Sequence, residues 1–155
     1  MLLSRPTTYA IRALLHLARR NQIEPMLAPE IAKAEQLPAS YLAKLLRTLS
    51  EAGFLHSSRG PGGGFWLARK PDQIRLREIS ELFDGLSLAN ECLLGYGRCA
   101  DDTPCPVHKL WGPRKEHVQE FLQNTTIMDL LKLDTKREAP LLEEPKRGRR
   151  KRTIL

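Results

Sequence analysis

Three cysteines and one histidine fall close together in the second half of this 155-residue chain. Their order is Cys92-x6-Cys99-x5-Cys105-x2-His108, and the sequence has no further cysteine. Thiolates are soft ligands that select zinc or iron–sulfur clusters. Glycines and prolines among them supply the turns that let one loop wrap a metal. The spacing therefore predicts a metal or cluster site in this loop.

The same four residues leave the kind of metal open. Three cysteines and one histidine also make a closed tetrahedral zinc site. The alternative without a metal is three unpaired buried cysteines beside an exposed histidine. The odd number and tight clustering of the cysteines disfavour a secreted disulfide framework. The other histidines, His16, His56 and His117, are expected at the surface. No nucleophile–base spacing or carboxylate pair stands out, so we expect no enzyme.

The first 70 residues carry the periodicity of three helices followed by a hairpin. The helices are expected at Tyr9–Arg20, from Pro29 to just before Gln36, and at about Ala39–Ala52; the strands are expected at Phe54–Ser57 and Phe65–Ala68. The strands are joined by the glycine-rich sequence 59–64. This order is the plan of a winged helix-turn-helix. The predicted fold class is mainly α with a small β-hairpin wing.

The outward face of the third helix offers hydrogen-bond donors and positive charge. Ser40 and Tyr41 could reach base edges or phosphates, Lys44 and Arg47 add charge, and Arg59 on the wing suits a narrow minor groove. A solvated face of an ordinary helical domain is the alternative for any one of these residues. Together, the turn, the basic face and the wing favour nucleic-acid binding.

The second half should hold the loop and a long apolar helix. A fourth helix is expected from Leu76 to near Gly85, then a loop over 86–106, then an apolar stripe from Val107 to Leu122 with near-heptad spacing that needs a partner helix. Gly112-Pro113 should kink or split that helix. Thr126 and Asp129 resemble a capping box that opens a last short helix. We expect a DNA-binding region at 1–70, the metal loop (86–108) with dimerisation helices at 71–133, and a disordered tail at 134–155.

Charge is distributed unevenly along the chain, whose net charge is +7. Residues 1–70 carry 10 basic and 4 acidic groups, residues 71–135 carry 7 and 11, and residues 136–155 carry 8 and 3. The basic first part fits a polyanionic partner, and the basic tail should add salt-sensitive attraction to DNA. No apolar run reaches the roughly 20 residues of a membrane span. We expect a cytoplasmic protein, associated with the nucleoid when bound to DNA, with no membrane partner and no small-molecule substrate.

These features together resemble a known family. Thr8-Tyr9-Ala10, Ser40-Tyr41-Leu42, the sequence 59–64, the three-cysteine loop and His108-Lys109-Leu110-Trp111 are similar to the bacterial iron–sulfur winged-helix regulators of the Rrf type, which include IscR-like and NsrR-like branches. The resemblance covers residues 1–133. The wing together with the cysteine loop makes it specific.

The resemblance implies a homodimeric transcription factor, mostly a repressor, that binds a partly palindromic double-stranded operator. Cys92, Cys99 and Cys105 would be cluster ligands, with His108 as the fourth in an IscR-like [2Fe-2S] site that senses iron or cluster supply, nitric oxide or redox state. Thr8 stands where NsrR-like members offer an acidic ligand, which disfavours a [4Fe-4S] cluster. Two rival interpretations are a zinc-stabilised Cys3His nucleic-acid-binding module without a sensing role and, more weakly, an electron-transfer protein.

Overall fold

The computed structural model describes residues 3–20, 24–85, 92–97, 99, 102 and 104–134. Its elements are α1 (Arg5–Arg19), α2 (Ala28–Glu35), α3 (Ala39–Glu51), β1 (Leu55–Ser58), β2 (Gly64–Leu67), the 3-10 turn η1 (Pro71–Gln73), α4 (Leu76–Asp84), α6 (His108–Asn124) and α7 (Ile127–Leu133). The predicted class, mainly helical with a β-hairpin, is confirmed. The tail, expected to be disordered, lies outside the described residues except for Asp134, as does 86–91 of the loop.

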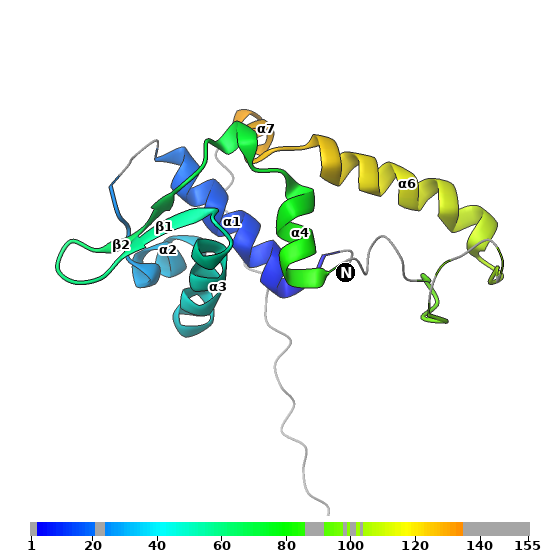
Figure 1. Cartoon of the computed structure of the whole chain (residues 1–155), viewed down its shortest axis with the longest axis horizontal. Coiled ribbons are helices and arrows are strands. Elements are labelled where there is room, and N and C mark those ends of the chain that lie inside the picture. The colour runs from blue at the N-terminus through cyan, green and yellow to red at the C-terminus, as the bar shows by residue number, and fades with distance from the viewer. Residues whose placement is uncertain are drawn as a thin grey trace, which may run out of the picture.

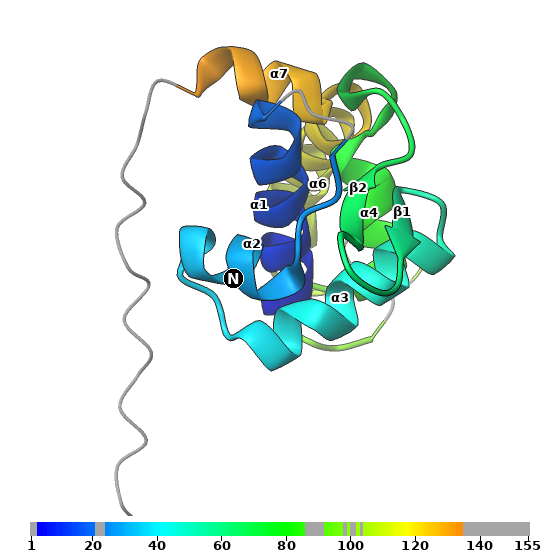
Figure 2. The same cartoon turned by 90° about the vertical axis from the view of Figure 1, so that its left-hand side faces the viewer.

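Helix α1 is the centre of the structure, with α2, α3, α4 and α7 around it (Figure 2). It begins four residues earlier than its apolar period indicated. The Ser4 side chain accepts a hydrogen bond from the Thr7 amide, and Pro6 suits the first turn of a helix. Ala10, Ala13 and Leu14 are fully buried, so the small residues of α1 let the neighbouring helices approach closely.

Helices α2 and α3 form the predicted helix-turn-helix. Between them, Gln36 adopts a left-handed backbone (φ 54°), and the Leu37 amide donates to the Ala32 carbonyl at 2.8 Å, which ends α2 sharply. The inward residues of α3 are the four leucines expected from their spacing, all buried: Leu42, Leu45, Leu46 and Leu49. The turn therefore sets the direction in which α3 leaves α2.

The wing is an antiparallel hairpin in which Leu55 pairs with Leu67 and Ser58 with Gly64. A third segment, not anticipated from the sequence, joins it. Met26 exchanges two backbone hydrogen bonds with Phe65, at 3.0 and 2.9 Å. The segment before α2 thus fixes the base of the wing against the helix-turn-helix.

Helix α6 runs without interruption through Pro113, so the expected split is wrong. Gly112 lacks the Cβ that would clash with a following proline ring, and this makes a helical backbone at that position tolerable. The Arg114 guanidinium also donates to the Leu110 carbonyl at 2.7 Å. Neither α6 nor any other helix among the described residues has the length and apolarity to span a bilayer.

The chain returns to the core after α6. Thr126 and Asp129 form the predicted capping box at the start of α7, and the Ile127 amide donates to the Ile74 carbonyl at 2.9 Å. Ile127 is fully buried in the same apolar core as Leu14 and Leu46. Figure 1 shows α6 standing out from this body, with the cysteine loop near its far end and the wing on the opposite side.

Candidate nucleic-acid interface and metal centre

The face of α3 opposite its buried leucines is exposed. Ser40, Tyr41, Lys44 and Arg47 all lie on it, as the sequence indicated. Because the four leucines hold the inner face of α3 against the core, the side chains on the opposite face project into solvent along two turns of the helix. The arrangement presents hydroxyl groups near the helix start and positive charge farther along.

Tyr41 is held in place by a residue whose role the sequence did not reveal. Its ring packs edge-on against Tyr9 of α1, with ring centroids 6.0 Å apart and an interplanar angle of 81°. Tyr9 is buried, whereas Tyr41 is 37% exposed. Edge-to-face contact of this kind restrains ring orientation, so the Tyr41 hydroxyl extends from a fixed base.

Arg59 lies exposed at the start of the wing tip. Behind it, the rings of His56 and Trp66 pack across the two strands at a centroid distance of 5.4 Å. Ser50 of α3 and Ser57 of β1 lie within hydrogen-bond distance, 3.1 Å between their oxygens. The wing and α3 are therefore connected on the exposed side as well as through the core.

The four predicted metal ligands line one cavity of about 330 Å³, together with Tyr96, Pro104 and Pro106. They approach one another in pairs. The sulfur atoms of Cys92 and Cys105 are 3.2 Å apart, and the Cys99 sulfur lies 3.5 Å from Nδ1 of His108. Within the described part of the chain, no three cysteine, histidine or acidic side chains gather tightly enough to enclose a single metal ion.

The thiols of the first pair differ in acidity. The hydrogen bond between Cys92 and Cys105, together with one from the Leu94 backbone amide, holds the pKa of Cys92 below its ordinary value. The same contact with Cys92, together with burial, raises the pKa of Cys105. The two thiols are therefore expected to lose their protons in separate steps, Cys92 before Cys105.

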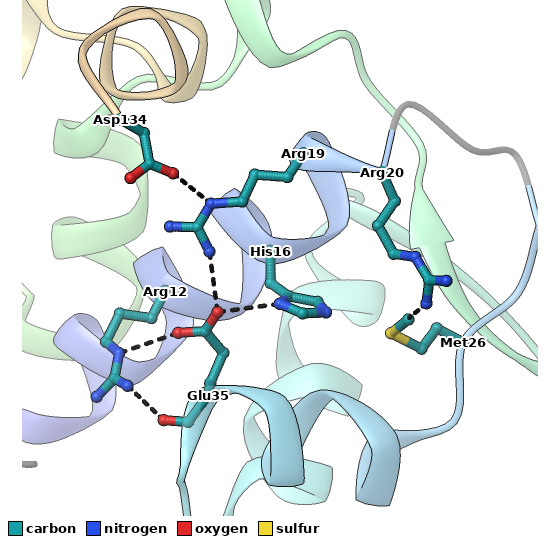
Figure 3. A network of polar contacts seen from close by, with 7 residues as sticks. All are labelled: Arg12, His16, Arg19, Arg20, Met26, Glu35 and Asp134. Atoms are coloured by element: carbon teal, nitrogen blue, oxygen red, sulfur yellow. Dashed lines mark hydrogen bonds and ion pairs between the residues drawn. The ribbon is translucent and has the colours of Figure 1, made fainter. Parts of the chain in front are cut away.

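A buried carboxylate beneath the helix-turn-helix was not anticipated. Glu35, 7% exposed, lies within 3.3 Å of Arg12 and 3.0 Å of both His16 and Arg19, all on α1 (Figure 3). Burial alone would raise the pKa of Glu35, but these partners outweigh it and hold the pKa low. His16 is thus part of a polar cluster, and its expected place as a surface residue is wrong. A paired charge inside α2 gives no periodic signal that could have revealed it.

The family model of Rrf2, described as an iron-dependent transcriptional regulator, matches residues 3–133. The chain belongs to the Rrf2 family. Among Rrf2-like relatives, an HTH-type transcriptional regulator from Aquifex aeolicus is 38% identical over 91% of this chain and 99% of its own length. The regulator IscR from Vibrio campbellii is 33% identical over 80% of this chain and 73% of its own length.

Solved structures agree with the Rrf2 assignment. CymR, the global cysteine regulator of B. subtilis, superposes with a TM-score of 0.71 at 28% identity, covering 85% of this chain and 97% of CymR. T. potens IscR superposes with a TM-score of 0.66 at 27% identity, covering 84% and 85%. This Rrf2 chain is therefore a winged-helix DNA-binding transcriptional regulator and not an enzyme.

Proposed function

We propose that this Rrf2 chain is a homodimeric repressor whose operator binding is controlled by an iron–sulfur cluster held by Cys92, Cys99, Cys105 and His108. The observation that carries the proposal is that these four side chains line one cavity at the start of α6. Relatives named as IscR support the same assignment. The bound cluster would sense iron or cluster supply, nitric oxide or redox state.

The donor set fits a two-iron cluster better than a single ion. Each iron of a [2Fe-2S] cluster takes two protein ligands, and the four side chains lie as two close pairs, 3.2 and 3.5 Å across. When bound, the group would supply redox and ligand-exchange chemistry at this loop. A single zinc ion held by all four side chains is the alternative, and metal analysis distinguishes the two.

The residues of the chain would couple this site to DNA through α6. Cys92, Cys99 and Cys105 lie on the loop, whereas His108 is the first residue of α6. A group that binds these cysteines and His108 would therefore connect the loop to α6. Leu110 and Phe121, 64% and 55% exposed, lie 11 residues apart and so on one face of α6, where a second copy would pack. The distance between two recognition helices would then depend on how α6 is held.

On the DNA, α3 would enter the major groove of each half-site of a partly palindromic operator. Ser40 and Tyr41 would contact base edges or phosphates, Lys44 and Arg47 phosphates, and Arg59 the minor groove. Two-fold symmetry would place the half-sites about 34 Å apart.

The test is selection of a preferred duplex from randomised DNA by the full chain, followed by affinity measurements with and without bound iron. Arg59→Ala and Lys44→Ala should weaken binding to that duplex, with Glu116→Gln on α6 as the control. Cys99→Ala should abolish the difference between iron-loaded and iron-free protein. If Cys99→Ala left both iron content and affinity unchanged, the sensing role would be wrong. Zinc in place of iron would favour the Cys3His binding module instead.

A further inference from the structure

Glu35 is placed where its carboxylate can restrain the recognition helix. It is the last residue of α2 and directly precedes Gln36, whose left-handed backbone starts the turn into α3. Its Oε1 atom lies 3.0 Å from Arg19, and its backbone carbonyl also accepts a hydrogen bond from Arg12. Both ends of this residue are thus held to α1, and the turn that directs α3 is held with them.

Arg19 has a second acidic partner at a distant point of the chain. While its Nη1 atom contacts Glu35, its Nε atom donates to Asp134, the residue that directly follows α7 (Figure 3). Burial alone would lower the pKa of Arg19, but Asp134 and Glu35 outweigh it and raise the pKa. One side chain therefore bridges the helix-turn-helix and the helix that follows α6.

The contact between Arg19 and Asp134 lies at the C-terminal end of α7. The first turn of α7 is anchored by Ile127 in the core and by its backbone bond to Ile74. Leu130 and Leu131 pack against the core farther along α7, and the Arg19 contact adds a polar restraint at its C-terminal end, where Asp134 lies. Only Thr125 and Thr126 separate α6 from α7, and this junction is hydrogen-bonded to the segment that starts α4. A change in the direction of α6 would therefore act on α4 and α7 together, and through α7 on the Arg19 contact.

The contacts of Arg19 with Glu35 and with Asp134 contribute differently to the free energy of unfolding. Glu35 is buried, so losing its partners would leave an unpaired charge and cost stability. Arg19 is 37% exposed as a side chain, and partly exposed ion pairs contribute little net stability. The Arg19–Asp134 contact should consequently affect position more than folding.

We propose that Arg19 is a positioning residue for DNA recognition, which fixes α3 relative to α7 by binding Glu35 and Asp134 at the same time. Movement of α6 and α7 would reach the recognition helix through this contact. The inference rests on the proposed function, because it assigns the route by which the loop at the start of α6 would affect operator affinity.

Hydrogen exchange on the full chain tests the mechanical part without DNA. Asp134→Asn removes the charge of Asp134 with little change of size, and Asp134→Glu should restore the contact. Arg20→Gln is the matched control: it removes one positive charge next to Arg19, from a side chain that contacts Met26 at 3.9 Å and neither carboxylate. In Asp134→Asn, the hydrogen-bonded amides of residues 35–37 should exchange about fivefold faster, and in Asp134→Glu and Arg20→Gln at the wild-type rate. Unchanged exchange in Asp134→Asn would overturn the proposal.

Affinity for the duplex selected by the wild-type chain tests the functional part. Asp134→Asn should bind it about 2- to 5-fold more weakly, whereas its thermal midpoint should match that of Arg20→Gln. A wild-type affinity in Asp134→Asn would also overturn the proposal. If the wild-type chain selects no duplex, the proposed function fails, and the exchange result alone then supports or overturns the bridge.

Discussion

The Cys99 sulfur lies 3.5 Å from Nδ1 of His108, and this contact joins the cysteine loop to the first residue of α6. The other pair, Cys92 with Cys105, lies within the loop itself. Only the first pair connects the loop with the helix that we expect to form the dimer. The contact between Cys99 and His108 is therefore the point at which a bound group would act on the rest of the protein.

Replacement of His108 should separate binding of the cluster from its effect on DNA. In His108→Ala the three cysteines remain, so we expect the protein to keep part of its iron. We also expect its operator affinity to be the same with and without iron. His117→Ala, on the same helix, is the control and should behave as wild type. Iron and sulfide analysis with binding to the selected duplex measures both. A His108→Ala protein that kept the full affinity difference would contradict the assigned role.

Glu35 should make the stability of the protein dependent on acid. Its pKa in the folded state lies below the ordinary value of 4.5, so its contribution is fully present above that value and is lost as pH falls through the folded pKa. Glu35→Gln should lower the free energy of unfolding at pH 7 by about 1–3 kcal/mol. It should also flatten the decline of stability below pH 4.5.

Denaturant unfolding at a series of pH values checks this prediction. Exposed Glu51→Gln serves as the control, with a change within about 0.5 kcal/mol at every pH. An equal pH dependence in Glu35→Gln and the wild type would show that the cluster around Glu35 does not contribute as described.

Gly64 should be required for the base of the wing. Its backbone has φ 152°, and a Cβ there would lie 2.5 Å from the Met26 carbonyl oxygen. Gly64→Ala therefore forces β2 away from Met26, and we expect a loss of about 1–3 kcal/mol of stability. Gly62→Ala is the control, since its φ of 76° is also left-handed but a Cβ would meet open space. Thermal unfolding of the two variants should show the larger loss for Gly64→Ala; equal losses would argue against the Met26 contact.

The exposed apolar face of α6 should hold the dimer together. Phe121→Glu places a charge on the face shared with Leu110, and we expect the chain to sediment as a monomer at concentrations where the wild type is a dimer. Glu116→Gln on the same helix should leave the mass unchanged. Sedimentation velocity distinguishes the outcomes, and a dimeric Phe121→Glu protein would place the interface elsewhere.

Local periodicity was enough to predict most of the elements. The leucines of α3 and the glycine-rich wing gave their positions to within a residue or two, because helix and hairpin signals depend on neighbouring residues. The start of α1 was missed because Ser4 and Pro6 act through capping and not through an apolar period. The continuity of α6 was missed because the general rule about proline takes no account of the residue before it, and Gly112 removes one of the clashes that Pro113 would make in a helix.

Contacts between distant segments could not be predicted from the sequence. The pairing of Met26 with Phe65, the packing of Tyr9 on Tyr41 and the bridge from Glu35 through Arg19 to Asp134 all join residues far apart in the chain. Such contacts depend on how the helices pack, and no local spacing encodes them. The candidate metal ligands could be proposed from the sequence because all three cysteines of the chain, with His108, fall within one segment, 92–108.

The most direct test of the central claim is anaerobic purification of the full chain, followed by its visible absorption spectrum and by iron, sulfide and zinc analysis of the same sample. We predict a brown protein with two irons and two sulfides per chain, as a [2Fe-2S] cluster requires, and a visible band that disappears in Cys99→Ala. A colourless protein with one zinc per chain would contradict the sensing role and leave the winged-helix regulator with a structural metal site.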